Sequence, residues 1–460
     1  MAASGKAGTA LTALREDLSG DVFAPGDPGY DEARTVFNAM IDRKPAVIAQ
    51  CESETDVVTA VRFARELDLP VAVRGGGHSV AGSAVADGAV VVDLRRMHEV
   101  TVHPAAKAVR IGGGATMSHL DRACQPYALA TTGGRASTTG VGGFVLGGGS
   151  GWLDRKFGLA VDNLLGVDLV TADGACVTAT AEDHPELFWA LHGGGGNFGI
   201  ATSLTLRLHD LPDMSIAFLL YLPEHGPEVL RTYRDVIEGG PREASGAMLY
   251  LTGPPEEFVP PHLVGTRMCA VLLTYAGPEE EMRRLARPLL ALPHESEIVT
   301  AIPYADLQCM IDDPPGMRNY WSAEYLTGLP DPCVDVFCAR GDRMPVPTGT
   351  QHLVWAQGGA IAEGPADYPV PYRDAAWAVH PFAIWEDPAD DERCRSWVKD
   401  VRADAQPWAT GAVYLNFTGD EGRDRVVAGL GAENIRRLAA VKGAYDPDNV
   451  FRFNHNIRPH

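Results

Sequence analysis

The stretch VAVRGGGHSVAG, from Val71 to Gly82, places three consecutive glycines directly before a single histidine, His78. Consecutive glycines reach backbone angles that other residues avoid, so their N–H groups can converge and hold an anionic group such as a pyrophosphate. His78 then lies at the end of the loop, within reach of whatever the anion carries. A tight turn with a surface histidine is the alternative, and the stretch alone favours neither interpretation.

Two further glycine clusters favour the ligand-binding interpretation. GVGGFVLGGGSG spans 140–151 and GGGGNFG spans 193–199, so all three clusters lie in the first half of the chain. Turns rarely need three or four glycines in a row, and one ligand met by several loops explains the clustering. The alternative is a loop-rich domain in a chain that contains 50 glycines.

The third cluster satisfies the dinucleotide-binding pattern GxGxxG at Gly194, Gly196 and Gly199. That pattern requires a helix after it, whose N-terminus points at the pyrophosphate. Residues 201–208 instead alternate leucines with polar residues, which is typical of a strand. We therefore reject a Rossmann fold for this cluster.

Length and composition describe an ordinary globular protein. With 460 residues, 45% hydrophobic and 22% charged, the chain can form a full core in two or three domains. No apolar run approaches the roughly 20 residues of a membrane-spanning helix, and the N-terminus lacks the layout of a secretion signal. We therefore expect a cytoplasmic protein with no membrane partner. The eight cysteines form no CxxC pair, which predicts free, mostly buried thiols and no metal site.

The net charge is −21, from 60 acidic and 39 basic residues, and no basic run occurs. Nucleic acid is disfavoured as a partner, because its binding depends on clustered Lys and Arg. An anionic ligand would have to be held by backbone N–H groups, which the glycine loops offer. The sequence leaves a homodimer open, since dimers are common among soluble proteins.

The order of elements predicts an α+β fold. Ser53 and Asp56 form a capping-box-like start, and apolar residues follow at helical spacing to about Leu67. Residues 1–50 indicate short helices. Strands are predicted at 69–73, 89–94, 109–114, 164–170, 201–208, 272–275, 352–357 and 412–417, and a helix at 279–292.

Five motifs occur in a fixed order: VAVRGGGHS at 71–79, GVGGFVLGGGSGWLDRKFGLAVDNL at 140–164, FWALHGGGGNFGIAT at 188–202, YLNF at 414–417 and YDPDNVFRFNHNI at 445–457. Together they resemble the berberine bridge enzyme-like FAD-linked oxidases of the vanillyl-alcohol oxidase type, and bacterial members most closely. The resemblance implies a two-part FAD-binding domain over 1–212 and a substrate domain over 213–405, with an antiparallel sheet covered by helices. A C-terminal segment, 406–460, then returns to the FAD domain.

The resemblance implies FAD joined covalently to His78 through the flavin 8α-methyl carbon, a bond that raises the reduction potential. Many relatives carry a second tether, a cysteine, where this chain has Ala136, so a single covalent bond is expected. Further contacts to FAD are implied for the glycine-rich motifs and their flanks: Arg74, Gly75, Gly76, Gly77, Ser79, Gly82, Gly140, Gly142, Gly143, Gly147, Gly148, Gly149, Gly151, Asn163, Gly199, Ile200, Asn454 and Asn456.

Three residues are candidates for the chemistry. Thr139 falls where the family controls access of O2 to the flavin, and its small side chain favours an oxidase; a packing role is the alternative. Tyr414 and Asn416 match the family's Y-x-N segment and would share one face of a strand. Tyr414 is the candidate general base, with a pKa lowered from about 10 by a neighbouring donor, although a core tyrosine is as compatible with the sequence. His192 replaces the usual arginine, which makes the local charge pH-dependent, and we interpret the replacement as a tolerated structural change.

Trp355 and Gln357 fall where relatives place substrate-facing residues, and Tyr250 and Tyr320 are further candidates for the pocket wall. An aromatic wall with a neutral amide favours an aromatic or polycyclic substrate of secondary metabolism. We expect a small-molecule oxidase that oxidises an alcohol, hydroquinone or C–N centre and passes electrons to O2. A drug-binding resistance flavoprotein, a dehydrogenase and an oxygenase are the alternatives.

Overall fold

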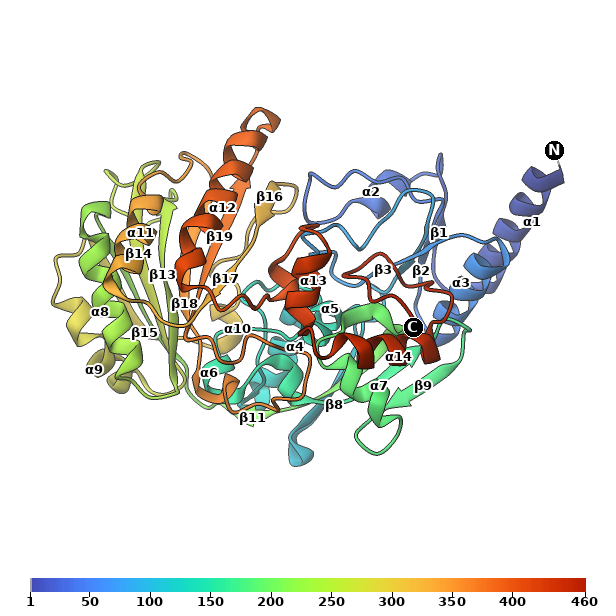
Figure 1. The fold of residues 1–460 in the computed structure, drawn as a ribbon, viewed down its shortest axis with the longest axis horizontal. Helices are drawn as coiled ribbons and strands as arrows, with labels where there is room; N and C mark the ends of the chain where they lie inside the picture. The colour runs from blue at the N-terminus through green and yellow to red at the C-terminus, as the bar shows by residue number, and fades with distance from the viewer. Residues whose placement is uncertain (1) are drawn as a thin grey trace.

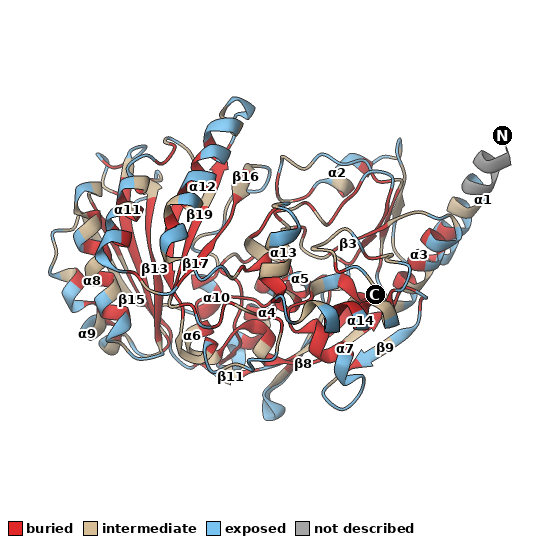
Figure 2. Cartoon of the chain, in the orientation of Figure 1, coloured by how far each residue is buried: buried red, intermediate tan, exposed pale blue. Residues whose placement is uncertain are grey.

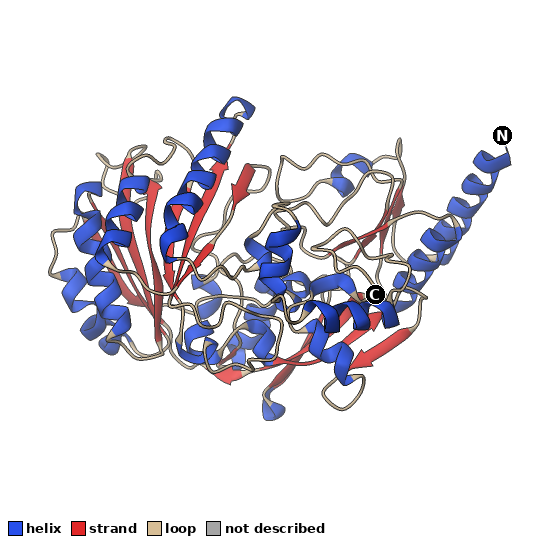
Figure 3. Cartoon of the chain, in the orientation of Figure 1, coloured by secondary structure: helices blue, strands red, loops and turns tan. Residues whose placement is uncertain are grey.

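The structure, a computed structural model, describes residues 2–460, with side chains from residue 8 onward. It has the mixed α+β architecture that the sequence predicts (Figures 1 and 3). An eight-stranded sheet with its helices forms one half of the molecule, and two smaller sheets support the glycine loops in the other half.

A four-stranded sheet carries the first glycine loop. Its strand order is β1 (Val22–Phe23), β2 (Val47–Gln50), β4 (Val90–Asp93) and β3 (Val71–Arg74), and the last three strands run parallel. Helix α3 (Glu54–Glu66) packs beside β4, and the Ser53 side chain accepts a hydrogen bond from the N–H of Asp56 at its start. The predicted helix and its cap are confirmed. The entry segment differs from the expected short helices, because α1 (Ala2–Asp17) is long and packs on α3; α2 (Tyr30–Arg34) is short.

A five-stranded antiparallel sheet lies beside the other two glycine loops. Its order is β5 (Val100–His103), β6 (Ala108–Gly112), β10 (Ile200–Arg207), β8 (Leu164–Val170) and β9 (Cys176–Ala179), and the strands predicted at 109–114, 164–170 and 201–208 are confirmed. A strand does follow the GxGxxG pattern, as expected. The associated helices are α4 (Met117–Cys124), α5 (Val141–Leu146), α6 (Asp154–Phe157) and α7 (Pro185–Leu191), and β7 (Leu129–Ala130) pairs with β11 (His209–Asp210).

The large sheet is antiparallel and has one face covered by helices. Its strands are, in order, β15 (Ser296–Ala301), β12 (Ser215–Tyr221), β14 (Arg267–Tyr275), β13 (Ala244–Thr252), β18 (Gln351–Ala356), β19 (Trp377–Trp385) and β16 (Arg318–Trp321), with β17 (Glu324–Leu326) also on β19. The covering helices are α8 (Gly226–Glu238), α9 (Glu279–Leu290), α11 (Asp331–Gly341) and α12 (Asp391–Ala405); the short α10 (Tyr304–Leu307) lies beside α4. Figure 2 shows the central strands buried and the outer helix surfaces exposed, and the edge strand β15 is only partly buried. The predicted helix at 279–292 and the strands at 272–275 and 352–357 are confirmed.

The strand predicted at 412–417 is wrong. Residues Leu415–Phe417 form a short 3₁₀ helix, and no β-pairing joins 412–417 to another strand. The alternating apolar residues that indicated a strand instead fill two cores, because Val413 and Leu415 pack with the five-stranded sheet while Tyr414 packs with the large sheet.

The C-terminal helices α13 (Arg423–Leu430) and α14 (Ile435–Tyr445) lie against the glycine-loop half of the molecule. The fully buried Lys442 fastens α14 there: its Nζ donates to Asp446 at 2.5 Å, to the carbonyl of Asn197 at 2.7 Å and to the carbonyl of Phe451 at 3.0 Å. One ammonium group therefore joins the last helix, the third glycine loop and the segment after the helix.

Replacing Lys442 with Met is expected to destabilise the protein by about 3–5 kcal/mol, because it leaves the buried Asp446 carboxylate without its cation. Thermal denaturation of Lys442→Met measures the loss. Lys399→Met, at an exposed position of α12, is the matched control and should change the melting temperature little. Equal effects of the two substitutions would contradict the role assigned to Lys442.

All eight cysteines are free thiols and six of them are buried, as predicted. None of the described helices is long and apolar enough to cross a bilayer. Within residues 2–460, no three His, Cys, Asp or Glu side chains gather in a way that would hold a metal ion.

Candidate functional site

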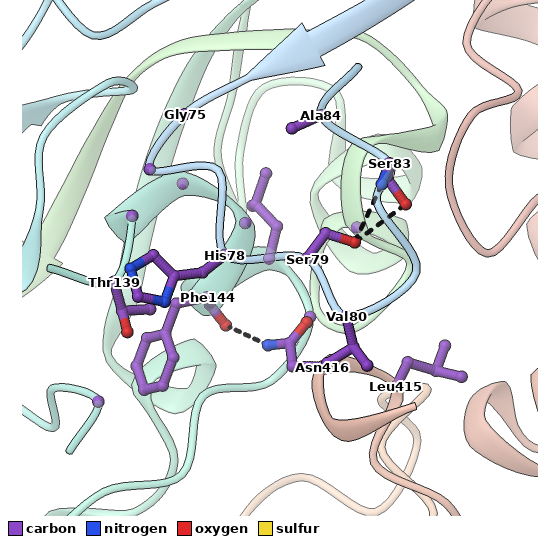
Figure 4. Close-up of a pocket in the computed structure, with 18 of the residues that line it drawn as sticks. Gly75, His78, Ser79, Val80, Ser83, Ala84, Thr139, Phe144, Leu415 and Asn416 are labelled. Atoms are coloured by element: carbon purple, nitrogen blue, oxygen red, sulfur yellow. Dashed lines mark hydrogen bonds between the residues drawn. The ribbon is translucent and has the colours of Figure 1, made fainter. Parts of the chain in front are cut away.

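A cavity of about 370 Å³ lies where the three glycine loops meet the uncovered face of the large sheet. Figure 4 shows part of its wall, with His78, Thr139 and Asn416. Segments that are far apart in sequence form most of its wall: 75–80, 134–150, 193–201, the strands β18 and β19, and the C-terminal residues 414–418 and 451–455. The glycine loops therefore do converge on one space, as their clustering predicts.

The first two glycine loops touch each other through their backbones. A Cβ on Gly76 would lie 2.4 Å from the backbone nitrogen of Gly140, and a Cβ on Gly140 would lie 2.3 Å from that of Gly76. A Cβ on Gly143, Gly195 or Gly196 would instead meet nothing within 4 Å, although all three residues line the cavity. These three positions leave their backbone open to a bound molecule.

His78 lies at the cavity wall, where it is half-buried. Its Nε2 is 2.9 Å from the hydroxyl of Thr138, and its ring stacks on Phe37 with centroids 4.1 Å apart. Burial lowers the pKa of His78 to about 4, so the imidazole is neutral at physiological pH. The contact with Thr138 occupies Nε2, while Nδ1 has no hydrogen bond within the part of the chain that the structure describes.

Tyr414 and Asn416 both line the cavity, although they do not lie on a strand. The Tyr414 hydroxyl accepts hydrogen bonds from the N–H groups of Gly149 at 3.1 Å and Ser150 at 3.3 Å, and from Asn416 Nδ2 at 3.0 Å. Asn416 also donates to the carbonyl of Phe144, as Figure 4 shows. The three donors around the phenol oxygen favour its negative form.

The expectation of a lowered pKa for Tyr414 is wrong. Burial raises the pKa of Tyr414 to about 12, outweighing the hydrogen bonds from Asn416, Ser150 and Gly149 and the charge of Arg135, all of which lower it. The tyrosine is only 1% exposed, and desolvation disfavours the phenolate more than its neighbours favour it.

Sequence reasoning missed two charged residues of the cavity wall. Arg135 is buried, lies 4.2 Å from the centre of the Trp355 ring, and donates to the carbonyl of Gly151 at 3.0 Å. Asp313 lies on the loop before β16, and burial raises the pKa of its carboxyl group to about 7, with Asp312 adding to the rise. Neither residue belongs to a recognisable motif, so the sequence carries no signal for them.

Most of the predicted flavin-binding residues line the cavity, and so does Thr139, a candidate for the chemistry. Lining residues among them are Gly75, Gly76, Gly77, His78, Ser79, Gly140, Gly142, Gly143, Gly147, Gly199, Ile200 and Asn454. The rest lie outside the lining: Arg74, Gly82, Gly148, Gly149, Gly151, Asn163 and Asn456.

Two of the excluded residues hold the surrounding structure. Arg74 donates to the carbonyls of Ala33 and Thr35, and Asn163 donates to those of Phe157 and Leu159. Gly149 does not line the cavity, but its N–H donates a hydrogen bond to the hydroxyl of Tyr414, which does.

Of the four predicted substrate contacts, the structure brings only Trp355 to the cavity. Tyr250 pairs with His352 and Tyr320 pairs with Ala383, and these positions belong to the sheet face that the helices cover. Their side chains therefore point away from the cavity. The neighbour Trp321 faces it instead, because successive side chains of a strand alternate.

Gln357 is buried just beyond the end of β18 and outside the cavity lining. His192 is buried and uncharged near neutral pH, which agrees with a tolerated structural change. Burial lowers the pKa of His192 to about 4, and the ring stacks on Tyr368 while its Nδ1 lies 2.6 Å from the carbonyl of Phe188. The histidine is a neutral packing residue.

Comparison with known proteins assigns this architecture. Residues 45–180 match the model of an FAD binding domain, and residues 413–458 match the model of berberine and berberine-like proteins. An uncharacterized FAD-linked oxidoreductase of Bacillus subtilis is 30% identical, over 96% of this chain and 97% of its own. The chain belongs to the berberine bridge enzyme-like family of FAD-linked oxidoreductases.

Two further members support the same assignment. The (R)-6-hydroxynicotine oxidase of Paenarthrobacter nicotinovorans is 30% identical over 96% of this chain and 97% of its own. The crystal structure of 6-hydroxy-D-nicotine oxidase from Arthrobacter nicotinovorans superposes with a TM-score of 0.86 at 28% identity, covering 96% of this chain and 98% of that one. This berberine bridge enzyme-like chain is therefore an FAD-dependent oxidoreductase, and its fold is of the vanillyl-alcohol oxidase type.

The residues of the cavity fit FAD. The open backbone positions Gly143, Gly195 and Gly196 leave room for a phosphate-bearing group that a side chain would displace. The protein has a net charge of −21 and therefore few cationic side chains to spare for the phosphates of FAD. Backbone N–H groups can bind these phosphates instead.

A valine at Gly143 is expected to abolish FAD binding while the protein still folds, because its side chain would enter the cavity and meet no protein atom at Cβ. Absorbance near the flavin band after purification, together with the melting temperature, measures both effects. Gly328→Val is the control: a Cβ at Gly328 is equally unobstructed, and the residue lies outside the cavity lining. Full flavin content in Gly143→Val would contradict the assignment of this space to FAD.

Proposed function

We propose that this protein is an oxidase with FAD held by a single covalent bond to His78, and that it oxidises an alcohol, hydroquinone or C–N centre of an aromatic or polycyclic small molecule, with O2 as electron acceptor. The observation that carries the proposal is the position of His78: a neutral imidazole with a free Nδ1 at the wall of the cavity that the glycine loops form. Only a neutral imidazole has a nitrogen lone pair with which to form such a bond.

The single bond is supported by Ala136, which lines the cavity with a methyl group where many relatives have a bonding cysteine. The oxidase outcome is supported by Thr139, a small residue of the same wall, and by the relatives named as oxidases of hydroxynicotine. We also propose the division into residues 1–212, 213–405 and 406–460, since the large sheet and its helices are built within 213–405.

Bound FAD supplies a two-electron acceptor at the glycine-loop wall. The protein supplies the aromatic wall that faces the glycine loops and the residue that accepts the substrate's proton. Trp355, Trp321 and Phe382 present aromatic surface on which a flat substrate would stack.

Tyr414 is the proposed proton acceptor. To accept the proton of a substrate hydroxyl or amine, Tyr414 must first be in its phenolate form, and the proton transfer returns it to the neutral phenol. The N–H groups of Gly149 and Ser150 and the side-chain amide of Asn416 point at the phenol oxygen and stabilise that phenolate.

The test is a metabolite screen read by peroxide release, followed by anaerobic mixing of each hit with the protein. Substrates of the proposed oxidase bleach the flavin without oxygen, and air restores the colour with release of H2O2. Tight binding that leaves the flavin spectrum unbleached would overturn the proposal in favour of a drug-binding protein. Bleaching followed by very slow recovery in air would overturn it in favour of a dehydrogenase.

A further inference from the structure

His380 is a polar residue of the cavity wall that the proposed chemistry does not use. It lies in β19 opposite Leu353, on the uncovered face of the large sheet, and is only 4% exposed. Its Nδ1 is 2.7 Å from the carbonyl oxygen of Ser322. Because a carbonyl oxygen can only accept, Nδ1 carries the proton and Nε2 holds a lone pair.

The lone pair of Nε2 has no partner in residues 8–460. The only hydrogen bond of the His380 side chain is the one at Nδ1. Although Nε2 has no partner, the protein does not seal this atom away from solvent. Since the ring lines the cavity, the free nitrogen is reached from the cavity.

Stacked aromatic rings fix the plane of the imidazole. Phe417 lies 4.2 Å away at 22°, Trp355 lies 5.4 Å away at 26° and Phe382 lies 5.6 Å away at 16°. Rotation of the ring would break the bond to Ser322 and this packing together. The direction of the lone pair is therefore set by the fold before any ligand enters.

The imidazole also stays neutral. Burial lowers the pKa of His380 to about 3, the bond to Ser322 opposes this, and the charge of Arg135 adds to it. The Arg135 guanidinium is engaged with Gly151 and, at 3.6 Å, with Asp154, and no hydrogen bond joins it to His380. Nε2 is thus an acceptor, and not a donor, throughout the physiological range.

We propose that Nε2 of His380 accepts a hydrogen bond from an O–H or N–H group of the substrate, so that the pocket selects neutral aromatic molecules that carry a donor at this position. The inference rests on the proposed function, because it takes this cavity as the substrate pocket of the oxidase. It gives the pocket a rule of selection: phenols, aromatic alcohols and N–H heterocycles fit, whereas the corresponding ethers, ketones and halides leave the buried nitrogen unpaired. An unpaired buried acceptor weakens binding.

The test compares two probes of nearly equal shape, 2-naphthol and 2-fluoronaphthalene, whose dissociation constants with the holoenzyme are measured by equilibrium dialysis. We expect the wild-type protein to bind 2-naphthol about tenfold more tightly, as one well-made hydrogen bond allows. In His380→Leu the ratio should fall to about one. In His380→Gln, whose amide oxygen can accept, a clear preference for 2-naphthol should remain.

His352→Gln is the matched control. His352 is a buried histidine on the neighbouring strand β18, but its Nε2 is 3.1 Å from the carbonyl of Phe337 on the helix-covered face. This variant should keep the wild-type ratio of dissociation constants even if its stability falls. A ratio near one in the wild-type protein, or an unchanged tenfold ratio in His380→Leu, would overturn the inference.

The two proposals fail separately. Equilibrium dialysis needs no turnover, so the ratio is measured whether or not the protein acts as an oxidase. Acid-stable flavin and peroxide release, measured on the same preparations, report on the proposed function alone.

Discussion

Acid precipitation of the wild-type protein is expected to give a yellow pellet, and the same treatment of His78→Ala a colourless one with all flavin in the supernatant. The reason is that a covalent bond through the free Nδ1 of His78 survives unfolding, whereas every contact made by the glycine loops is lost with the fold. The absorbance of pellet and supernatant gives the bound fraction directly, and the change is from complete retention to none.

His98→Ala is the control for this experiment, because His98 is exposed and does not line the cavity. Its pellet should be as yellow as that of the wild type. Thr138→Val, which removes the hydroxyl 2.9 Å from Nε2, should slow the attachment without preventing it. If the wild-type pellet is colourless while the native protein is yellow, FAD is bound but not tethered, and the covalent part of the proposal is wrong.

Replacement of Tyr414 by Phe is expected to slow anaerobic flavin reduction by about 10²- to 10⁴-fold, the usual contribution of a group that takes a proton in the transition state. The pH dependence should change as well. With a pKa near 12, the phenolate fraction of the wild-type protein rises about tenfold per pH unit below that value. The reduction rate should therefore increase with pH up to the limit of stability, and should be nearly independent of pH in Tyr414→Phe. Stopped-flow traces at several pH values measure both effects.

Tyr372→Phe separates the chemical role from packing. Tyr372 is also buried, and its ring lies 5.2 Å from that of Tyr414. Its hydroxyl has no hydrogen-bond partner among the side chains and backbone that the structure describes, and the residue lies outside the cavity lining. Its loss should leave the reduction rate within a factor of a few of the wild type. Tyr414→Phe also strands the N–H groups of Gly149 and Ser150, so some loss of stability is expected in that variant. Unchanged reduction in folded Tyr414→Phe would remove the residue from the mechanism.

Local sequence patterns predicted much of the fold. The cap at Ser53, the period of the helix after it and the apolar strands at 164–170 and 201–208 depend on residues close together in sequence, and the structure has all of them. The prediction of a strand at 412–417 was wrong because the alternating apolar residues do not form one buried face. Neighbouring residues there fill two separate cores instead.

The cavity wall was predictable only where a motif marks it. The glycine loops and the Y-x-N segment carry such motifs, but Asp313 and His380 reach the site through the pairing of distant strands and loops. Tyr250 and Tyr320 are the opposite case, because they were predicted to line the pocket and point away from it. Which face of the sheet a side chain occupies depends on strand register, and a shift by one residue reverses it.

Because residues 414–418 and 451–455 form part of the cavity wall, and Lys442 fastens that part to the third glycine loop, the pocket is finished only after residue 455 has left the ribosome. Flavin capture is therefore a step of maturation that follows synthesis, and the N-terminal sheets must wait in an apo form meanwhile.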